Sequence, residues 1–287
     1  MYKHACLIMA HNEFGVLRRL VQILDDSRND IYIHFDKKVA HLPKLECHKA
    51  NLFVLGDEER ISVFWGTVSQ IKAEMSLFSC AYKNRPYRYY HVLSGVHLPL
   101  WSQNDLYDFY EKEYPQEIMS LWNSSEEEAD FKLRRFHFGV QWMKSERCVL
   151  RLLGFSVWRV CLFVQKRLGI RCNKGQSFRK ASNWLSLSEN AVVYLLVNRL
   201  RIEKMYRYSF CPDEYFVPTT LNEYPYKFKI GNVQNLLYVQ FYKANPLEIT
   251  MEDYEQIRLS SCMFARKFTE KHMDVVDRVL DSISCEK

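Results

Sequence analysis

Short apolar runs and helically spaced apolar positions alternate along the first hundred residues. The runs at 5–10 and 31–35 each predict a buried strand. Between them, Asn12 can cap a helix whose single apolar face is made by Leu17, Leu20, Val21 and Leu24. The opening segment therefore predicts a strand, a helix and a second strand.

The alternation continues with predicted strands at 52–55 and 88–93. Thr67 and Gln70 form a capping-box pattern for a helix between these strands, with apolar positions at Ile71, Met75, Leu77 and Phe78. Strands that alternate with helices predict an α/β fold, with a Rossmann-like, mostly parallel sheet and helices on both faces. Ligands of such sheets collect beyond the carboxyl ends of the strands, which are here 10–12, 34–38 and 94–97.

Further helix starts are predicted in the second half of the chain. Ser186 and Glu189 form another capping-box pattern, which would open a helix through Leu200. Thr250 and Thr269 are typical caps of two more helices. Since no repeat, low-complexity tract or linker separates these elements, we expect one domain over 1–287.

The stretch at about 131–175 is basic and amphipathic, with seven arginines and four lysines among many apolar residues. Arg151, Arg159 and Lys166 interrupt its apolar run, so a membrane-spanning helix of about 18 apolar residues is not expected. Two interpretations remain open: a helical excursion packed on the domain, or an interfacial helix that contacts anionic lipid.

Composition adds a globular class and a preference for anionic partners. The chain has 287 residues, 48% of them hydrophobic, and a formal charge of +6, which suits phosphates, nucleic acid or an anionic membrane. Nine cysteines, with no C-x-x-C pair, indicate reduced thiols and a cytoplasmic protein. The apolar run at 5–10 is too short for a signal peptide, so we interpret it as a strand.

One acidic motif on this basic chain indicates chemistry. Pro212 fixes a turn that would deliver Asp213 and Glu214 to the start of the next element. Transfer of a sugar from a nucleotide needs a base for the acceptor hydroxyl and positive charge for the departing diphosphate. Glu214 is the candidate base and Lys267 the candidate cation; a capped helix start and a solvated basic turn are the structural alternatives.

The charge on the diphosphate would have to be met by side chains, because the sequence contains no Asp-x-Asp motif for a divalent metal. Arg266 and Lys267 are adjacent and point in different directions, so we expect Lys267 to face the phosphates. No metal or other cofactor is therefore expected.

Other candidate donor contacts lie near the predicted strand ends. Asp36 can accept hydrogen bonds from uracil or ribose, or can serve a turn. His11 ends the first strand and is a better candidate than His34. Trp65, just before a helix, is either a pocket wall or a core residue. Ser94 and Gly95 form a tight turn where backbone can approach a ligand.

The sequence lacks the motifs of several other chemistries. It has no phosphate loop, no G-x-G-x-x-G after the first strand, no G-x-S-x-G elbow and no H-E-x-x-H. A nucleic-acid-binding module is suggested only by the positive charge and the aromatic content, and no reading element supports it.

Seven segments of the chain, taken in order, resemble the Core-2/I-branching β-1,6-N-acetylglucosaminyltransferases and the peptide O-xylosyltransferases of glycosyltransferase family 14. The segments are Ile8-Met9-Ala10-His11, Ile33-His34-Phe35-Asp36-Lys37-Lys38, Val63-Phe64-Trp65-Gly66, Leu93-Ser94-Gly95-Val96-His97-Leu98-Pro99-Leu100, Asn183-Trp184-Leu185-Ser186-Leu187, Pro212-Asp213-Glu214 and Phe264-Ala265-Arg266-Lys267-Phe268. The resemblance implies a GT-A-like fold, a UDP-sugar donor, inversion at the anomeric carbon and no metal. It also implies that Glu214 is the base, Lys267 a diphosphate ligand and Asp36 a uridine contact.

Three positions depart from the family pattern. His97 stands where an aspartate is usual, and Ala181 where a glycine is usual. Leu237 occupies the place of a second phosphate-binding arginine, for which Lys243 or Arg266 would have to substitute.

We therefore expect a metal-independent, inverting glycosyltransferase with a nucleotide-binding half at about 1–125 and an acceptor and catalytic half at about 176–287. The expected donor is UDP-N-acetylglucosamine, ahead of UDP-xylose, UDP-galactose or UDP-glucose, and the acceptor is a glycan hydroxyl. Trp184, Asp213 and Tyr215 are the expected acceptor contacts. We expect a bacterial, cytoplasmic enzyme, with the inner face of the membrane as a candidate further partner. The alternative is a degenerate, non-catalytic member that binds glycan or membrane.

Overall fold

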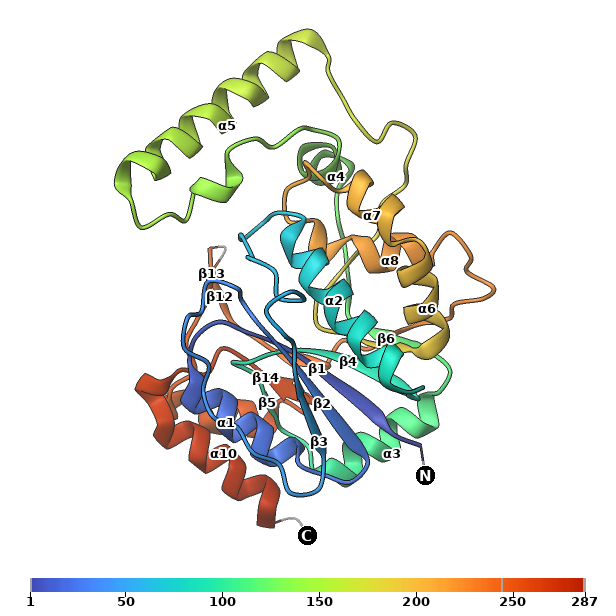
Figure 1. Ribbon diagram of the computed structural model, residues 1–287, viewed down its shortest axis with the longest axis vertical. Coiled ribbons are helices and arrows are strands. Elements are labelled where there is room, and N and C mark those ends of the chain that lie inside the picture. Colours follow the sequence, from blue (N-terminus) through green and yellow to red (C-terminus); the bar gives the residue numbers. More distant parts are fainter. Residues whose placement is uncertain (1, 244, 286–287) are drawn as a thin grey trace.

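The computed structural model describes residues 2–243 and 245–285, and its centre is a seven-stranded sheet (Figure 1). The strand order is β10-β6-β9-β4-β1-β2-β3. The strands are β1 (His4–Ala10), β2 (Asn29–Phe35), β3 (Asn51–Val54), β4 (Tyr89–Ser94), β6 (Glu117–Met119), β9 (Ser186–Ser188) and β10 (Ile230–Asn232). Only β9 runs antiparallel to its neighbours β4 and β6. The predicted α/β fold with a mostly parallel sheet is confirmed.

Helices cover both faces of this sheet because successive residues of the central strands point to opposite sides. Cys6 and Ile8 of β1 face α1 (Phe14–Leu24) and α10 (Met273–Cys285). Ala5 and Leu7 face α2 (Ser69–Asn84), α6 (Glu189–Val197), α7 (Arg199–Met205) and α8 (Phe216–Leu221). The remaining helices are α3 (Gln103–Glu113), α4 (Glu126–Leu133), α5 (Cys148–Leu168) and α9 (Tyr254–Leu259), with 3-10 turns η1 (Val140–Trp142), η2 (Pro212–Glu214), η3 (Met251–Asp253) and η4 (Glu270–His272).

Three small sheets accompany the large one. β5 (Leu98–Pro99), β14 (Phe264–Ala265) and β11 (Leu237–Tyr238) form one, β7 (Leu121–Trp122) and β8 (Lys180–Ala181) the second, and β12 (Phe241–Tyr242) and β13 (Asn245–Pro246) the third. β9 and β10 from the second half of the chain add to the sheet begun by the first half, so both halves share one sheet.

The predicted elements are present, but several predicted caps are wrong. Glu13, not Asn12, precedes α1, and its side chain makes no cap hydrogen bond. Val68 precedes α2, and its apolar side chain cannot cap the helix. The predicted box does not form, because the Thr67 hydroxyl donates to the Phe64 carbonyl and the Gln70 amide is engaged with Gly66 and Asp213.

The three later predicted caps have different outcomes in the structure. Ser186 lies in β9 and binds His91, so Ser188 caps α6 two residues later, and α6 ends at Val197. The Thr250 cap is confirmed, as Thr250 and Asp253 form a capping box at η3. Thr269 precedes η4 but makes no side-chain cap hydrogen bond.

The predicted excursion contains η1 and α5, and α5 projects from one end of the molecule (Figure 1). α5 is the one helix of the described chain that is long and apolar enough to cross a membrane, judged by length and composition. The eight cysteines whose side chains are described are free thiols.

Candidate functional site

The carboxyl ends of β1, β2 and β4 meet at one edge of the sheet because these strands are parallel neighbours in register. The Asp36 N–H donates to the Ala10 carbonyl at 2.9 Å, and the Gly95 N–H donates to the Met9 carbonyl at 2.8 Å. His11, Asp36 and the Ser94–Gly95 turn therefore lie side by side, as parallel strand ends should.

Asp36 is buried and already serves a turn. Its Oδ1 accepts from the Lys38 N–H at 2.9 Å, and its Oδ2 lies 3.3 Å from the Lys38 ammonium. Lys38 Nζ also donates to the Val63 carbonyl at 2.6 Å, which fixes the loop that carries Trp65. Asp36 thus stabilises a turn at this edge of the sheet, and its contact with a uridine stays a prediction.

His11 shares this edge with three charged groups. Desolvation at the strand edge lowers its pKa, Asp36 acts in the opposite direction, and Lys38 and Lys267 lower it further. Lys267 follows β14 at this place, so the predicted donor residues His11, Asp36 and Lys267 do come together. His34, by contrast, is buried and accepts the Ile61 N–H at 2.9 Å, which is a structural role.

Ser94 and Gly95 approach protein rather than open space. A Cβ added at Gly95 would lie 3.1 Å from the Cβ of Ala10, so the glycine allows the ends of β4 and β1 to pack. The Ser94 N–H donates to Nδ1 of the buried His97 at 3.3 Å.

His97 and Arg266 both contact the ring of Trp184. The His97 ring meets the Trp184 ring edge-on at 4.6 Å, and the Arg266 guanidinium lies 4.9 Å from the Trp184 centroid. Burial lowers the pKa of Arg266 to about 10. Its backbone N–H donates to the Tyr238 carbonyl at 3.0 Å, so Arg266 stands beside Leu237, where the family pattern has its second arginine.

The predicted catalytic turn is joined to the loop that carries Trp65. Cys211 has φ 47°, and its N–H donates to the Gly66 carbonyl at 3.0 Å. Gln70 bridges the two segments, accepting from the Gly66 N–H at 2.8 Å and donating to Asp213 Oδ2 at 3.0 Å. Gly66 has φ 72°, and an added Cβ would lie 3.0 Å from the Phe210 ring, so this junction requires glycine.

Asp213 does not cap a helix, which was the structural alternative for this motif, and its carboxyl group is buried. Its Oδ1 has no hydrogen-bond partner among the described residues. Burial first, and then the charge of Glu214, raise the pKa of Asp213 to about 7. The nearby Glu74 is also buried, and burial together with Asp213 raises its pKa well above the usual range. Asp213 thus holds the turn through its hydrogen bond with Gln70, and its contact with an acceptor stays a prediction.

Glu214 forms a cluster with two lysines and a second carboxylate. Its Oε2 accepts from Lys132 at 2.9 Å and lies 3.4 Å from Lys180. Both lysines also bind Glu128, at 2.9 and 2.8 Å. The Glu214 side chain remains 25% exposed, so a substrate hydroxyl can reach it.

Sequence reasoning missed Glu128, Lys132 and Lys180. The i, i+4 spacing of Glu128 and Lys132 on a helix was the available signal. Burial opposes the charge on Lys132, but Glu214 and Glu128 outweigh it and raise the pKa of Lys132. The salt bridges lower the pKa of Glu128 to about 2 against the effect of burial. The ion pairs therefore stabilise the charged forms of Glu128 and Lys132.

Sequence reasoning also missed Lys144, which lies against the loop that carries Trp65. Its Nζ lies 4.2 Å from the Trp65 centroid. Burial lowers the pKa of Lys144. The charge of Cys211 acts to raise it, and the charge of Lys267 lowers it further. Lys144 is thus close enough to Cys211 and to Lys267 for their charges to affect its pKa.

An open cavity of about 570 Å³ adjoins the Glu214 cluster through Lys180. Its lining combines an aromatic ring with amides and hydroxyls: Trp122, Asn123, Ser124, Asn232 and Gln234, among others. Tyr215, predicted to contact the acceptor, is instead fully buried, and its hydroxyl lies 3.0 Å from that of Ser124. Tyr215 therefore supports the cavity wall from behind.

The described residues offer no group of three or more His, Cys, Asp or Glu side chains placed to hold a metal ion. Lys132 and Lys180 are paired with Glu214 and Glu128. The other cations, near the strand edge and the Trp65 loop, are Lys38, Lys144, Arg266 and Lys267. They can supply the positive charge that a diphosphate leaving group requires.

Comparison with known proteins gives a family and a distant structural likeness. Residues 5–276 match the family described as Core-2/I-Branching enzyme. No curated protein matches the chain. Among solved structures, the chain is similar to the apo form of mouse xyloside xylosyltransferase 1, with 9% sequence identity and a TM-score of 0.40, over 92% of this chain and 96% of that chain. A likeness this distant bears on neither substrate nor residues.

Proposed function

This chain belongs to the Core-2/I-branching enzyme family of glycosyltransferases, and on that premise we propose that it transfers a sugar from a UDP-sugar to a glycan hydroxyl with inversion and without a metal. The observation that carries the proposal is the partly exposed Glu214 carboxylate, held by Lys132 at 2.9 Å beside a cavity of about 570 Å³.

The reaction is a single displacement. Glu214 takes the proton of the acceptor hydroxyl while the hydroxyl oxygen bonds to the anomeric carbon. The bond from that carbon to the β-phosphate oxygen breaks, and its electron pair leaves with UDP. The carboxyl group of the neighbouring Asp213 is buried, and its Oδ1 has no partner among the described residues, so Asp213 is not proposed as a nucleophile and a single displacement with inversion is the proposed course.

Lys267 and Lys144 are the proposed ligands of the departing diphosphate, with Arg266 in support behind Trp184. Leu237 cannot contribute charge, but Arg266 lies next to the same strand and supplies a guanidinium close by. Asp36 and His11 bound the place proposed for the uridine. N-acetylglucosamine is the proposed sugar, ahead of xylose, galactose and glucose.

The cavity lined by Trp122 is the proposed acceptor groove. An aromatic ring provides an apolar platform for the face of a sugar, and amides such as Asn232 can bind its hydroxyls. Because Lys180 lines this cavity and contacts Glu214, an acceptor bound there would lie next to the proposed base.

The decisive experiment compares Glu214→Gln with Glu128→Gln. Both variants remove one carboxylate from the same lysine pair, but only the first removes the proposed base. UDP release from UDP-N-acetylglucosamine with a glycan acceptor should fall by about 10²- to 10⁴-fold in Glu214→Gln. UDP binding, measured by calorimetry, should stay near the wild-type value in both variants.

A Glu214→Gln enzyme that turns over near the wild-type rate would refute the assignment of the base. A wild-type protein that binds UDP but neither transfers nor hydrolyses any UDP-sugar would instead support the non-catalytic alternative.

A further inference from the structure

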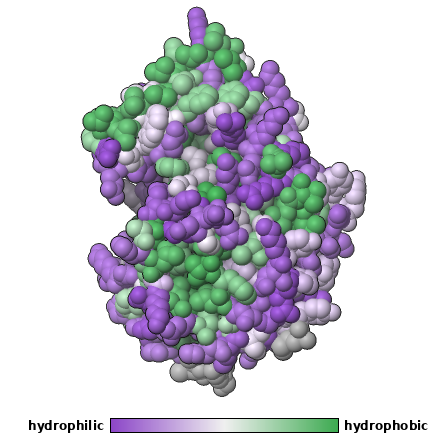
Figure 2. Space-filling model, viewed as in Figure 1, coloured by the Kyte–Doolittle hydropathy of each residue, from purple (hydrophilic) through white to green (hydrophobic). Residues whose placement is uncertain are grey.

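α5 exposes apolar side chains along most of its length. Val149 is 76% exposed and Phe163 is 72% exposed. The other exposed apolar residues of this helix are Leu152, Leu153, Phe155, Val160, Val164 and Leu168. Figure 2 shows the resulting hydrophobic surface over α5 at the top of the molecule. A contiguous apolar surface of this kind marks an interaction site.

The opposite side of α5 is fixed to the rest of the chain. Trp158 Nε1 donates to His137 Nδ1 at 2.8 Å, and the Gln165 amide exchanges two hydrogen bonds with the Phe136 backbone, at 2.7 and 2.8 Å. Gly154 packs on Gly139, since an added Cβ at Gly154 would lie 2.9 Å from the Gly139 carbonyl oxygen. The apolar face is therefore held outward by a specific attachment.

The hydrogen bonds that attach α5 to the protein, and its charged residues, decide whether the helix would span a membrane or lie flat on its surface. α5 has the length and composition of a spanning helix, and only 11% of its apolar window is buried, so it is not a core helix. Arg159 lies near its middle, however, where a guanidinium in hydrocarbon is strongly unfavourable. Spanning would also break the hydrogen bonds of Trp158 and Gln165. A helix that lies flat, with its attached side toward the protein, keeps both.

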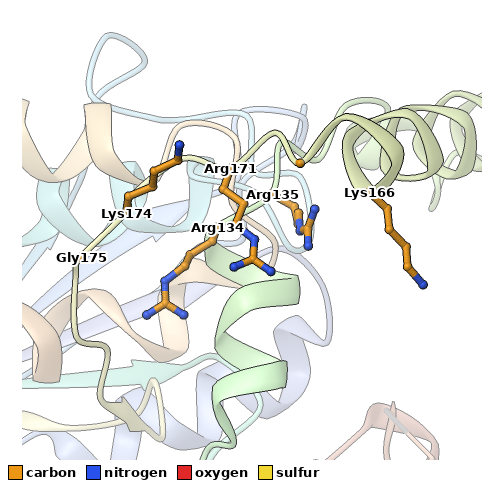
Figure 3. A pocket seen from close by; sticks show the side chains of 7 residues that line it. Arg134, Arg135, Lys166, Arg171, Lys174 and Gly175 are labelled. Carbon is orange, nitrogen blue, oxygen red and sulfur yellow. The ribbon is translucent and has the colours of Figure 1, made fainter.

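A basic cavity of about 620 Å³ opens at the carboxyl end of α5. Five basic side chains line it: Arg134, Arg135, Lys166, Arg171 and Lys174. Figure 3 shows Arg134, Arg135 and Arg171 near one another at the end of α4, with Lys166 on α5 and Lys174 on the following loop pointing in other directions.

The cavity keeps a surplus of positive charge. Glu126 pairs with Arg134 at 2.9 Å, and Asp130 pairs with Arg135 and Arg171 at 2.9 and 3.2 Å. Within residues 2–243 and 245–285, no ion pair engages Lys166 or Lys174. Two ammonium groups beside three guanidinium groups suit a phosphate oxygen.

We propose that α5 docks in the headgroup region of an anionic bilayer, with its outward apolar face in the acyl boundary and a lipid phosphate in this basic cavity. Lys166 belongs both to α5 and to the lining of the cavity, and an apolar helix face next to a basic cavity is complementary to an anionic lipid surface. The proposal does not depend on the sugar-transfer chemistry.

Docking of α5 also places the Glu214 turn beside the membrane. Phe210 directly precedes that turn, and its ring lies 6.2 Å from Trp158 and 5.5 Å from His137. The attached side of α5 thus packs on the segment that leads into the candidate catalytic turn.

The test is co-sedimentation of the full chain with vesicles. Wild-type protein should bind vesicles that contain phosphatidylglycerol, bind phosphatidylcholine vesicles weakly, and lose binding as salt rises. Replacing Lys166 and Lys174 by alanine should lower the partition coefficient by about 30-fold, at about fivefold for each basic side chain. Phe163→Asp should lower it by about tenfold or more.

Matched surface variants serve as controls. Leu200→Asp changes an apolar residue that is 84% exposed on α7, and Lys204→Ala removes an exposed charge from the same helix. Both should leave binding unchanged. Equal binding to neutral and anionic vesicles would overturn the proposal, as would binding that resists high salt and alkaline carbonate, the behaviour of a spanning helix. A dimer that Phe163→Asp dissociates, without any vesicle binding, would assign the apolar face to a second copy and overturn the proposal as well.

Discussion

Because the carboxyl group of Asp213 is buried, we expect the free energy of unfolding of this protein to fall as pH rises through the titration of Asp213. Asp213 Oδ2 accepts one hydrogen bond, from Gln70 at 3.0 Å, and its Oδ1 has no partner among the described residues. Replacement by asparagine keeps an acceptor for Gln70 and removes the buried charge. We therefore expect Asp213→Asn to stabilise the protein at neutral and alkaline pH.

The magnitude follows from the pKa. Burial and Glu214 raise the pKa of Asp213 from 3.8 to about 7. Between about pH 4 and pH 7 the folded protein holds a proton that the unfolded chain releases, so the free energy of unfolding falls as pH rises through this range. A difference of about three pKa units corresponds to about 4 kcal/mol at most. Glu74, whose pKa is raised by burial, adds an effect of the same sign.

The assay is urea unfolding of wild-type protein and Asp213→Asn from about pH 4 to about pH 8.5. The two should agree within about 1 kcal/mol at the acidic end. The variant should be more stable by up to about 4 kcal/mol at the alkaline end. Asp108→Asn, at an exposed position of α3, is the control and should follow the wild type.

An Asp213→Asn protein that is less stable than wild type at pH 8 would refute this reasoning, because it would mean that an ionised Asp213 stabilises the fold. Identical pH profiles would show that the carboxyl group is solvated in the folded protein.

Four further outcomes are expected. UDP should raise the melting temperature equally with and without EDTA, because lysines supply the positive charge that binds it. UDP at 100 times its dissociation constant adds about 2.7 kcal/mol to the free energy of unfolding. A strict Mn²⁺ or Mg²⁺ requirement would contradict this prediction. Lys267→Ala should weaken UDP binding by about 10- to 100-fold in calorimetry, whereas the exposed Lys271→Ala should not. Trp122→Ala should raise the KM for the glycan acceptor while the KM for the donor stays constant; equal KM values in both proteins would remove the proposed acceptor groove. Gly154→Ala should cost about 1–3 kcal/mol and expose α5 to protease, because the added Cβ meets the Gly139 carbonyl at 2.9 Å, whereas Gly56→Ala enters open space.

Much of the fold was predictable because its signals are local. The apolar runs at 5–10, 31–35 and 88–93 each became a central strand, and the helical spacing of Leu17, Leu20 and Leu24 became the buried face of α1. Such patterns act within one element, where a strand or a helix repeats its own geometry. The Pro212 turn and the positions of Asp36 and Lys267 were visible for the same reason.

Helix N-caps were less predictable, because a side chain with a capping sequence can instead form its hydrogen bond with a distant part of the chain. Ser186 has the sequence context of a cap, but its hydroxyl lies 2.7 Å from the His91 ring in the neighbouring strand, so Ser188 caps α6 instead. Gln70 similarly does not complete the predicted capping box. Its amide instead donates to Asp213, which is 143 residues away in the sequence.

The sequence by itself determined the α/β class, the family motifs and the acidic turn, because each depends on residues that are close together in the sequence. Only the tertiary structure decided how the site is built. Lys132 and Glu214 are 82 residues apart, and they meet because α4 and η2 pack at the same end of the sheet. The insertion of β9 between β4 and β6, and the burial of Asp213 beside Glu74, depend likewise on contacts between distant segments. No local pattern encodes such contacts, because they form only when the whole core excludes water and brings those segments together.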